Sequence, residues 1–97
     1  MIIDFHTHAF PDKLAPRAIA SLTEACGRLY MPCSNGTVDG LTSNMDEFGV
    51  NISVVQPVIT KPSQHNTLNL WARDIQNERI ISFGGFHHES NDYKRDI

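Results

Sequence analysis

The residues best suited to chemistry are two histidines in the segment Asp4-Phe5-His6-Thr7-His8, close to the N-terminus. Residues two apart in a β-strand point to the same side, with Cα atoms roughly 6.5–7 Å apart. Two imidazoles at that spacing can bind one cation, and histidine nitrogens bind zinc at about 2.0–2.1 Å. The spacing therefore predicts that His6 and His8 are metal ligands, with two unrelated surface histidines as the alternative.

Asp4 is expected on the same side of this strand, two residues before His6. A carboxylate there could accept a proton from an imidazole, which would fix the tautomer and orientation of a metal-binding ring. Asp4 is therefore predicted to support the metal ligands without binding the ion itself.

The elements that must position these histidines begin with a strand over residues 1–8, in which apolar and polar side chains alternate. Pro11 ends this strand, and Asp12 is suited to cap the N-terminus of a helix. Apolar residues follow at helical spacing, namely Ala15, Ala18, Ile19, Leu22, Cys26 and Leu29. This order puts the histidine pair at the carboxyl end of a strand, where parallel α/β folds build their sites.

The rest of the chain continues the alternation of helices and strands. Residues 41–48 predict a second helix, with Gly49 at the left-handed position that ends it. Residues 52–58 and 80–86 predict strands. Between them we expect a turn over residues 60–63 and a helix whose apolar stripe runs from Leu68 to Ile75 and that closes at Asn77. Residues 89–97 have the polar character of the start of a further helix.

This order of elements predicts an α/β fold with parallel strands and a sheet covered on both faces. The 97 residues allow one domain, and 40% hydrophobic with 20% charged residues is ordinary for a soluble protein. A net charge of -3 argues against nucleic-acid binding, and no apolar run approaches the roughly 20 residues of a membrane span. The N-terminus lacks the pattern of a signal peptide, so a cytoplasmic location is expected. Cys26 and Cys33 are expected to be reduced thiols, with a disulfide between them as the alternative.

Several segments together resemble the start of a known group of enzymes. Residues 2–8 (Ile-Ile-Asp-Phe-His-Thr-His) are similar to the first strand of the amidohydrolase superfamily. Residues 54–58 (Val-Val-Gln-Pro-Val), 69–72 (Asn-Leu-Trp-Ala) and 78–87 (Glu-Arg-Ile-Ile-Ser-Phe-Gly-Gly-Phe-His) narrow the resemblance to its amidohydrolase-related group of metal-dependent hydrolases and decarboxylases. The resemblance covers essentially all 97 residues. It implies a (β/α)8 barrel of the TIM type, of which this chain supplies the first three βα units.

The resemblance also implies a metal centre. His6 and His8 match the two metal ligands of the first strand, which implies a divalent metal cofactor, with zinc as the first candidate. His87 matches a histidine near the end of the third strand, although His88 stands where such proteins commonly have a proline. The remaining ligands and a catalytic aspartate belong to later strands in this group, and no motif for them occurs in this sequence.

Three residues at or after strand ends are candidates for a substrate pocket, namely Gln56, Lys61 and His87. Each of the three could equally be a solvated or packed polar residue. The implied substrate is a carbonyl-containing small molecule, and the implied reaction is hydrolysis of an amide, ester or lactone by metal-activated water. The alternatives are decarboxylation within the same group, a phosphoesterase of the PHP or TatD type, and a non-catalytic module.

The chain is expected to be incomplete, because a TIM barrel typically needs about 250 residues. Residues 1–97 would then form part of a domain and be inactive alone. An open three-stranded sheet leaves apolar edges that tend to pair with another chain. Self-association into a homo-oligomer is therefore expected.

Overall fold

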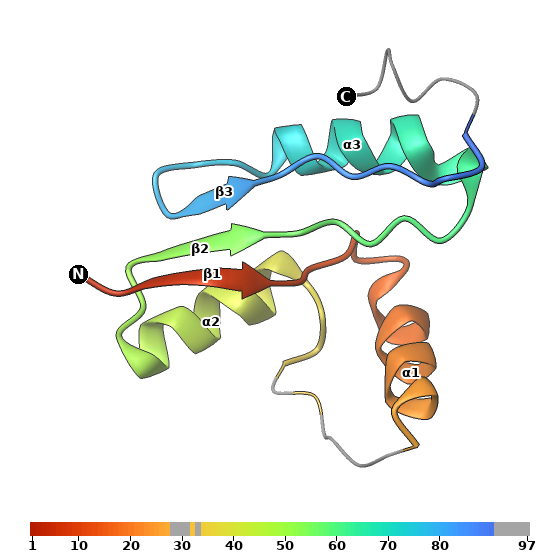
Figure 1. Cartoon of the computed structure of the whole chain (residues 1–97). Coiled ribbons are helices and arrows are strands. Elements are labelled where there is room, and N and C mark those ends of the chain that lie inside the picture. The colour runs from red at the N-terminus through yellow and green to blue at the C-terminus, as the bar shows by residue number, and fades with distance from the viewer. Residues whose placement is uncertain (28–31, 33, 91–97) are drawn as a thin grey trace.

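The computed structural model describes residues 1–27, 32 and 34–90. Its elements are β1 (Ile3–Thr7), α1 (Ala15–Ala25), α2 (Val38–Phe48), β2 (Ile52–Val55), the short 3-10 helix η1 (Pro62–Gln64), α3 (His65–Asp74) and β3 (Ile80–Ser82). The three strands are parallel and form one sheet in the order β1-β2-β3 (Figure 1). The predicted α/β class with parallel strands is therefore confirmed, as one open sheet. No helix within the described ranges has the length and apolar character needed to cross a membrane.

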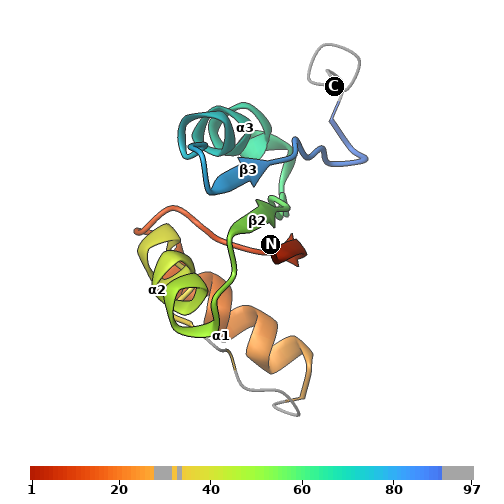
Figure 2. The ribbon, with the colours of Figure 1, turned by 90° about the vertical axis from the view of Figure 1, so that its left-hand side faces the viewer.

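Helices cover one face of the sheet, and within the described residues the other face is open. α2 and α3 lie on the same side of the strands, and α1 lies beyond the free edge of β1 (Figure 1, Figure 2). On the open face, Phe5 is 64% exposed and Ile81 is 44% exposed. The expectation that both faces are covered is wrong for this part of the chain, because both connections between strands pass on the same side.

The core lies between the sheet and the two helices on its covered face. The register places Ser53 beside Ile80 and Val55 beside Ser82, so alternate residues of β2 and β3 point toward the helices. Val55 and Ile80 are almost fully buried and belong to one core cluster with Met45 of α2. Partly buried apolar side chains complete this core, namely Val38, Leu41, Val50, Trp71 and Ile75.

α2 carries its own start and stop signals. The Thr37 hydroxyl accepts a hydrogen bond from the Gly40 N–H at 3.0 Å, which caps the first turn. Gly49 ends the helix in the left-handed conformation, with φ at 71°, where a side chain would be strained. The predicted role of Gly49 is confirmed.

The predicted start of the first helix is wrong. α1 begins at Ala15, and Leu14 rather than Asp12 occupies the N-cap position. Residues 12–14 form a turn instead, in which the Pro11 carbonyl accepts the N–H groups of Leu14 and Ala15 at 2.8 and 3.0 Å. Pro16 lies in the first turn, where a missing N–H costs nothing, so the helix begins without a side-chain cap.

The second and third strands are shorter than predicted. β2 ends at Val55 rather than at residue 58, and β3 ends at Ser82 rather than at residue 86. Pro57 has no N–H with which to continue the ladder. Beyond β3, the side chain of Asn69 binds the backbone of Gly85, so this segment pairs with α3 instead of extending the sheet. The features predicted at Leu29, Cys33 and residues 91–97 lie outside the described residues.

α3 also departs from its predicted boundaries. η1 takes up part of the expected turn over residues 60–63, and α3 ends at Asp74 rather than at Asn77. The Asn77 side chain instead holds the start of β3. Its Oδ1 accepts the N–H groups of Arg79 and Ile80 at 2.8 and 2.9 Å.

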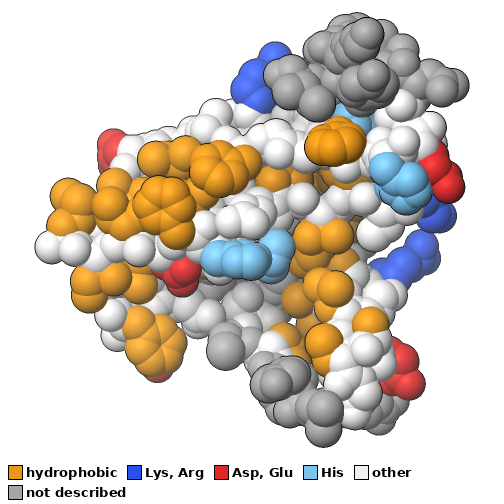
Figure 3. Space-filling model, viewed as in Figure 1, with side chains coloured by type: hydrophobic (Ala, Val, Ile, Leu, Met, Phe, Trp, Pro, Cys, Tyr) orange, Lys and Arg blue, Asp and Glu red, His pale blue; other side chains and the backbone are white. Residues whose placement is uncertain are grey.

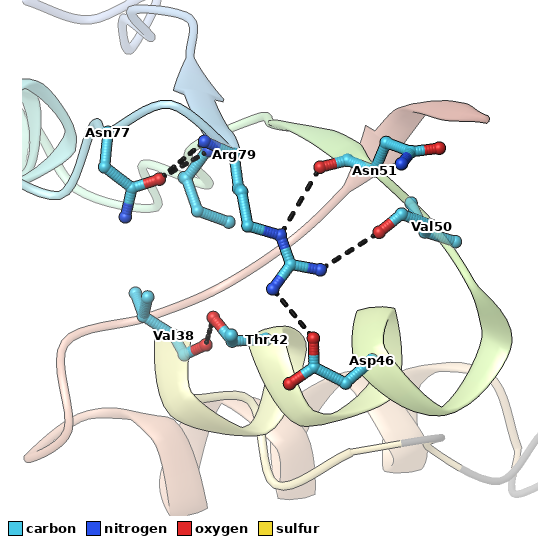
Figure 4. A network of polar contacts seen from close by, with 8 residues as sticks. Val38, Thr42, Asp46, Val50, Asn51, Asn77 and Arg79 are labelled. Atoms are coloured by element: carbon cyan, nitrogen blue, oxygen red, sulfur yellow. Dashed lines mark hydrogen bonds and ion pairs between the residues drawn. The ribbon is translucent and has the colours of Figure 1, made fainter. Parts of the chain in front are cut away.

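Arg79 joins the start of β3 to the connection between α2 and β2 (Figure 4). Its Nη1 lies 2.7 Å from Oδ1 of Asp46, and its Nη2 donates to the Val50 carbonyl at 3.1 Å. Its Nε donates to the Asn51 carbonyl at 3.5 Å. One planar guanidinium therefore satisfies three acceptors that precede β2, which fixes α2 against the sheet.

Candidate metal centre

The two histidines predicted as metal ligands lie side by side at the carboxyl end of β1. Their Nε2 atoms are 3.2 Å apart and share a hydrogen bond whose direction depends on the tautomers, and their ring centroids are 5.0 Å apart with the planes at 74°. Two ligand atoms at about 2.0–2.1 Å from one tetrahedral ion are separated by roughly 3.3–3.4 Å. His6 and His8 are both exposed, and the separation of their Nε2 atoms is close to that of two adjacent ligands of a zinc-type site.

A shift of register in β1 sets the direction of the two rings. Asp4 lies opposite Ser53 of β2, and Thr7 lies opposite Val55, so β1 takes three residue steps where β2 takes two. The extra residue is a bulge, which reverses the side that later residues face relative to a regular strand. Thr7 is buried on the helix side, and the two histidines are exposed. Figure 3 shows histidine side chains on the open face, beside apolar side chains that cover the strands.

The ring of His8 is held by a hydrogen bond between its Nδ1 and the carbonyl oxygen of Gln56, at 2.8 Å. A carbonyl can only accept, so Nδ1 of a neutral His8 carries the proton and Nε2 presents a lone pair. Histidines that bind metals commonly donate their other N–H in this way. His8 therefore directs the lone pair of Nε2 toward Nε2 of His6.

Asp4 supports the histidine segment in a way that differs from the prediction. Its Oδ1 accepts the backbone N–H of His6 at 3.2 Å. The predicted contact with an imidazole is not formed among the described residues, because the bulge interrupts the regular alternation on which the prediction depended. Asp4 therefore holds the backbone of the bulge.

Gln56, a predicted pocket residue, lies directly after β2 and against the histidine segment. Its backbone N–H donates to the Thr7 carbonyl at 2.8 Å, and its side-chain Nε2 donates to the Phe5 carbonyl at 2.9 Å. With the bond to His8, three polar groups of Gln56 contact three residues of the segment. The sequence gives no signal for these contacts beyond the position of Gln56 at a strand end.

A cavity of about 570 Å³ lies beside the histidine pair, between β1, α1 and α2. This volume is within the range of sites for small molecules. His6 and His8 line one part of the cavity, and apolar side chains form much of its walls, among them Ile19, Leu22 and Met45. The cavity lies on the helix side of β1, where Met45 also belongs to the core.

None of the three pocket candidates lines this cavity, and Lys61 and His87 also lie apart from the histidine pair. Lys61 lines a second cavity of about 280 Å³. His87 stacks on His88 with ring centroids 4.5 Å apart, and its Nδ1 accepts the Glu89 N–H at 3.2 Å. Neither Lys61 nor His87 lines the cavity beside the histidine pair. Of the three candidates, the structure brings only Gln56 to the pair.

Within residues 1–27, 32 and 34–90, no group of three His, Cys, Asp or Glu side chains is placed to hold a metal ion. Catalytic zinc sites usually have three protein ligands, and the pair supplies two. Comparisons with protein-family models, with curated proteins and with solved structures find no match for this chain. The geometry of the pair is therefore the main basis for assigning a function.

Proposed function

We propose that His6 and His8 are two ligands of a divalent metal, with zinc as the first candidate, in an amidohydrolase-type hydrolase of small carbonyl compounds. The observation that carries this proposal is the 3.2 Å separation of the two Nε2 atoms, with Nδ1 of His8 bonded to a carbonyl. The location at the carboxyl end of a parallel strand supports it, because α/β enzymes place their sites there. The remaining ligands would come from outside the described residues.

The proposal includes a barrel of the TIM type, of which the three strands are the first part. Parallel strands in sequential order with helices on one side are features of such a barrel, whose helices form the outer layer. The open face would then line the interior of the barrel. This placement accounts for the exposed apolar side chains of Phe5 and Ile81 on that face.

A metal held by the pair would supply Lewis-acid chemistry, which polarises a carbonyl and activates water. The residues of this chain prepare the site for it. The Gln56 carbonyl keeps the proton of His8 on Nδ1, so that Nε2 carries a lone pair, which faces Nε2 of His6.

The metal site is tested by titrating the whole chain with zinc, using calorimetry and proton–nitrogen spectra of the imidazole rings. We expect zinc to shift the Nε2 signals of His6 and His8, and each of His6→Ala and His8→Ala to remove most of the binding. The control is a variant with both His87→Ala and His88→Ala, which removes two histidines outside the site. Zinc binding that persists in His6→Ala and His8→Ala would contradict the proposal.

The reaction class is tested on the natural gene product that contains these residues. Amide, ester and lactone substrates are compared with phosphate esters, with and without zinc. Zinc-dependent hydrolysis of carbonyl substrates that is lost in His6→Ala supports the proposal. Hydrolysis of phosphate esters alone, or release of carbon dioxide from a carboxylic acid without hydrolysis, would overturn it.

A further inference from the structure

We infer that Gln56 is a positioning residue for the histidine pair and that it acts through the bulge in β1. The inference rests on the proposed function in one respect, namely that the ligand of the histidine pair is a divalent metal. It goes beyond that function because it assigns the geometry of the pair to a residue on a different strand, 48 positions from His8.

Gln56 makes three hydrogen bonds to the segment that carries the histidines. Its N–H donates to the Thr7 carbonyl at 2.8 Å, its carbonyl accepts from Nδ1 of His8 at 2.8 Å, and its Nε2 donates to the Phe5 carbonyl at 2.9 Å. The contacted groups lie on both sides of His6 in the chain. Gln56 therefore fixes the backbone around one histidine and the ring of the other.

The side-chain bond is the one that substitution can remove. In the bulged segment, side chains bond to two backbone groups. The His6 N–H bonds to the Asp4 carboxylate, and the Phe5 carbonyl bonds to the Gln56 amide. Without the amide, the Phe5 carbonyl loses this donor, and the bulge keeps the bonds from the His6 N–H to Asp4 and from the Thr7 hydroxyl to the Val54 carbonyl.

The bulge determines which side of the sheet the histidines face. A one-residue change of register moves every later side chain of a strand to the opposite face. A regular β1 would place Val55 beside His6 instead of Thr7, since regular pairing from Asp4 and Ser53 advances both strands equally. The rings would then turn toward the helix side, and Nδ1 of His8 would leave the Gln56 carbonyl. The Gln56 amide thus favours the register in which the pair is exposed and His8 has a fixed tautomer.

The test is Gln56→Met, which keeps the length of the side chain and removes its donor. In the metal-free chain, nitrogen shifts of the imidazoles report the tautomer of each ring. We expect the proton of His8 to reside on Nδ1 in the original chain and to redistribute between the two nitrogens in Gln56→Met. The affinity for zinc should fall on the order of 10-fold, as for other residues that orient a metal ligand.

The matched control is Gln76→Met. The Gln76 side chain accepts the Ser82 N–H at 3.0 Å, so this variant also removes a glutamine contact at the end of a strand, on β3 and away from the pair. We expect its unfolding free energy to fall comparably, with the His8 tautomer and zinc affinity unchanged. If Gln56→Met does not fold, Gln56→Glu takes its place, because a carboxylate keeps the polarity and cannot donate to the Phe5 carbonyl.

The outcomes separate this inference from the proposed function. An unchanged tautomer in the Gln56 variant, or the same change in Gln76→Met, overturns the inference even if zinc binds to the pair. A changed tautomer in the Gln56 variant alone supports the inference even if zinc does not bind, and in that case the proposed function fails by itself.

Discussion

The side-chain amide of Asn69 forms two hydrogen bonds with the backbone of Gly85, each 2.8 Å long. Its Nδ2 donates to the Gly85 carbonyl, and its Oδ1 accepts the Gly85 N–H. One side chain thus pairs with both polar groups of a residue, as a neighbouring strand would. This contact fixes the segment after β3 against α3, which explains why the third strand is shorter than the apolar run of residues 80–86.

Asn69→Ala should lower the free energy of unfolding by about 1–3 kcal/mol, because two partly buried backbone groups lose their partner. The amide hydrogen of Gly85 should also exchange faster with solvent. Chemical denaturation and hydrogen exchange measure the two effects. Asn66→Ala, at an exposed position of the same helix, is the control and should leave both quantities close to their original values. Equal effects at the two positions would show that the Gly85 contact contributes nothing specific.

Arg79→Lys should lower the free energy of unfolding by about 1–3 kcal/mol, since an ammonium group cannot reach three separate acceptors in one plane. Most of this loss comes from the carbonyls of Val50 and Asn51, which the guanidinium satisfies. Denaturation at two salt concentrations measures it, and the loss should persist at high salt. Arg73→Lys is the control, because Arg73 pairs with Asp74 at an exposed site and such pairs contribute little. A larger loss in the control would contradict this account.

The features that the sequence predicted correctly depend on neighbours in the chain. Gly49 follows an apolar helical pattern directly, and its φ of 71° is a local requirement that glycine meets. The alternation of apolar runs likewise indicated the three strands and their parallel order. The adjacency of His6 and His8 was also foreseeable, because it follows from a spacing of two on one strand.

The features that the sequence did not reveal depend on partners distant in the chain. The bulge between Asp4 and Thr7 exists only with respect to the register of β2. The contacts of Gln56 and Asn69 join residues 48 and 16 positions apart, which no local pattern in the sequence indicates. Asp12 does not cap α1. The Pro11 carbonyl closes a turn over residues 12–14, and this turn competes with the capping conformation.

Met45→Ala should lower the free energy of unfolding by about 2–5 kcal/mol, because it leaves a cavity in the core between α2 and the sheet. Met45 is 2% exposed and belongs to the same cluster as Val55 and Ile80. Urea denaturation measures the loss. Phe48→Ala, one turn later in α2 at a side chain that is 67% exposed, should change stability by less. A larger loss of stability in Phe48→Ala than in Met45→Ala would mean that the core is centred elsewhere.

Replacing Asp4 distinguishes the contact seen in the structure from the one predicted from the sequence. Asp4→Asn keeps an oxygen that can accept the His6 N–H, whereas Asp4→Ala removes it. Because the described contact is with the backbone and not with an imidazole, the asparagine variant should keep its zinc affinity within about twofold. The alanine variant should lose on the order of 10-fold. Calorimetry measures the zinc affinity of the two variants and of the original chain. Denaturation curves confirm that both variants are folded. An equal loss in Asp4→Asn and Asp4→Ala would instead show that the negative charge acts on the metal or on a ring.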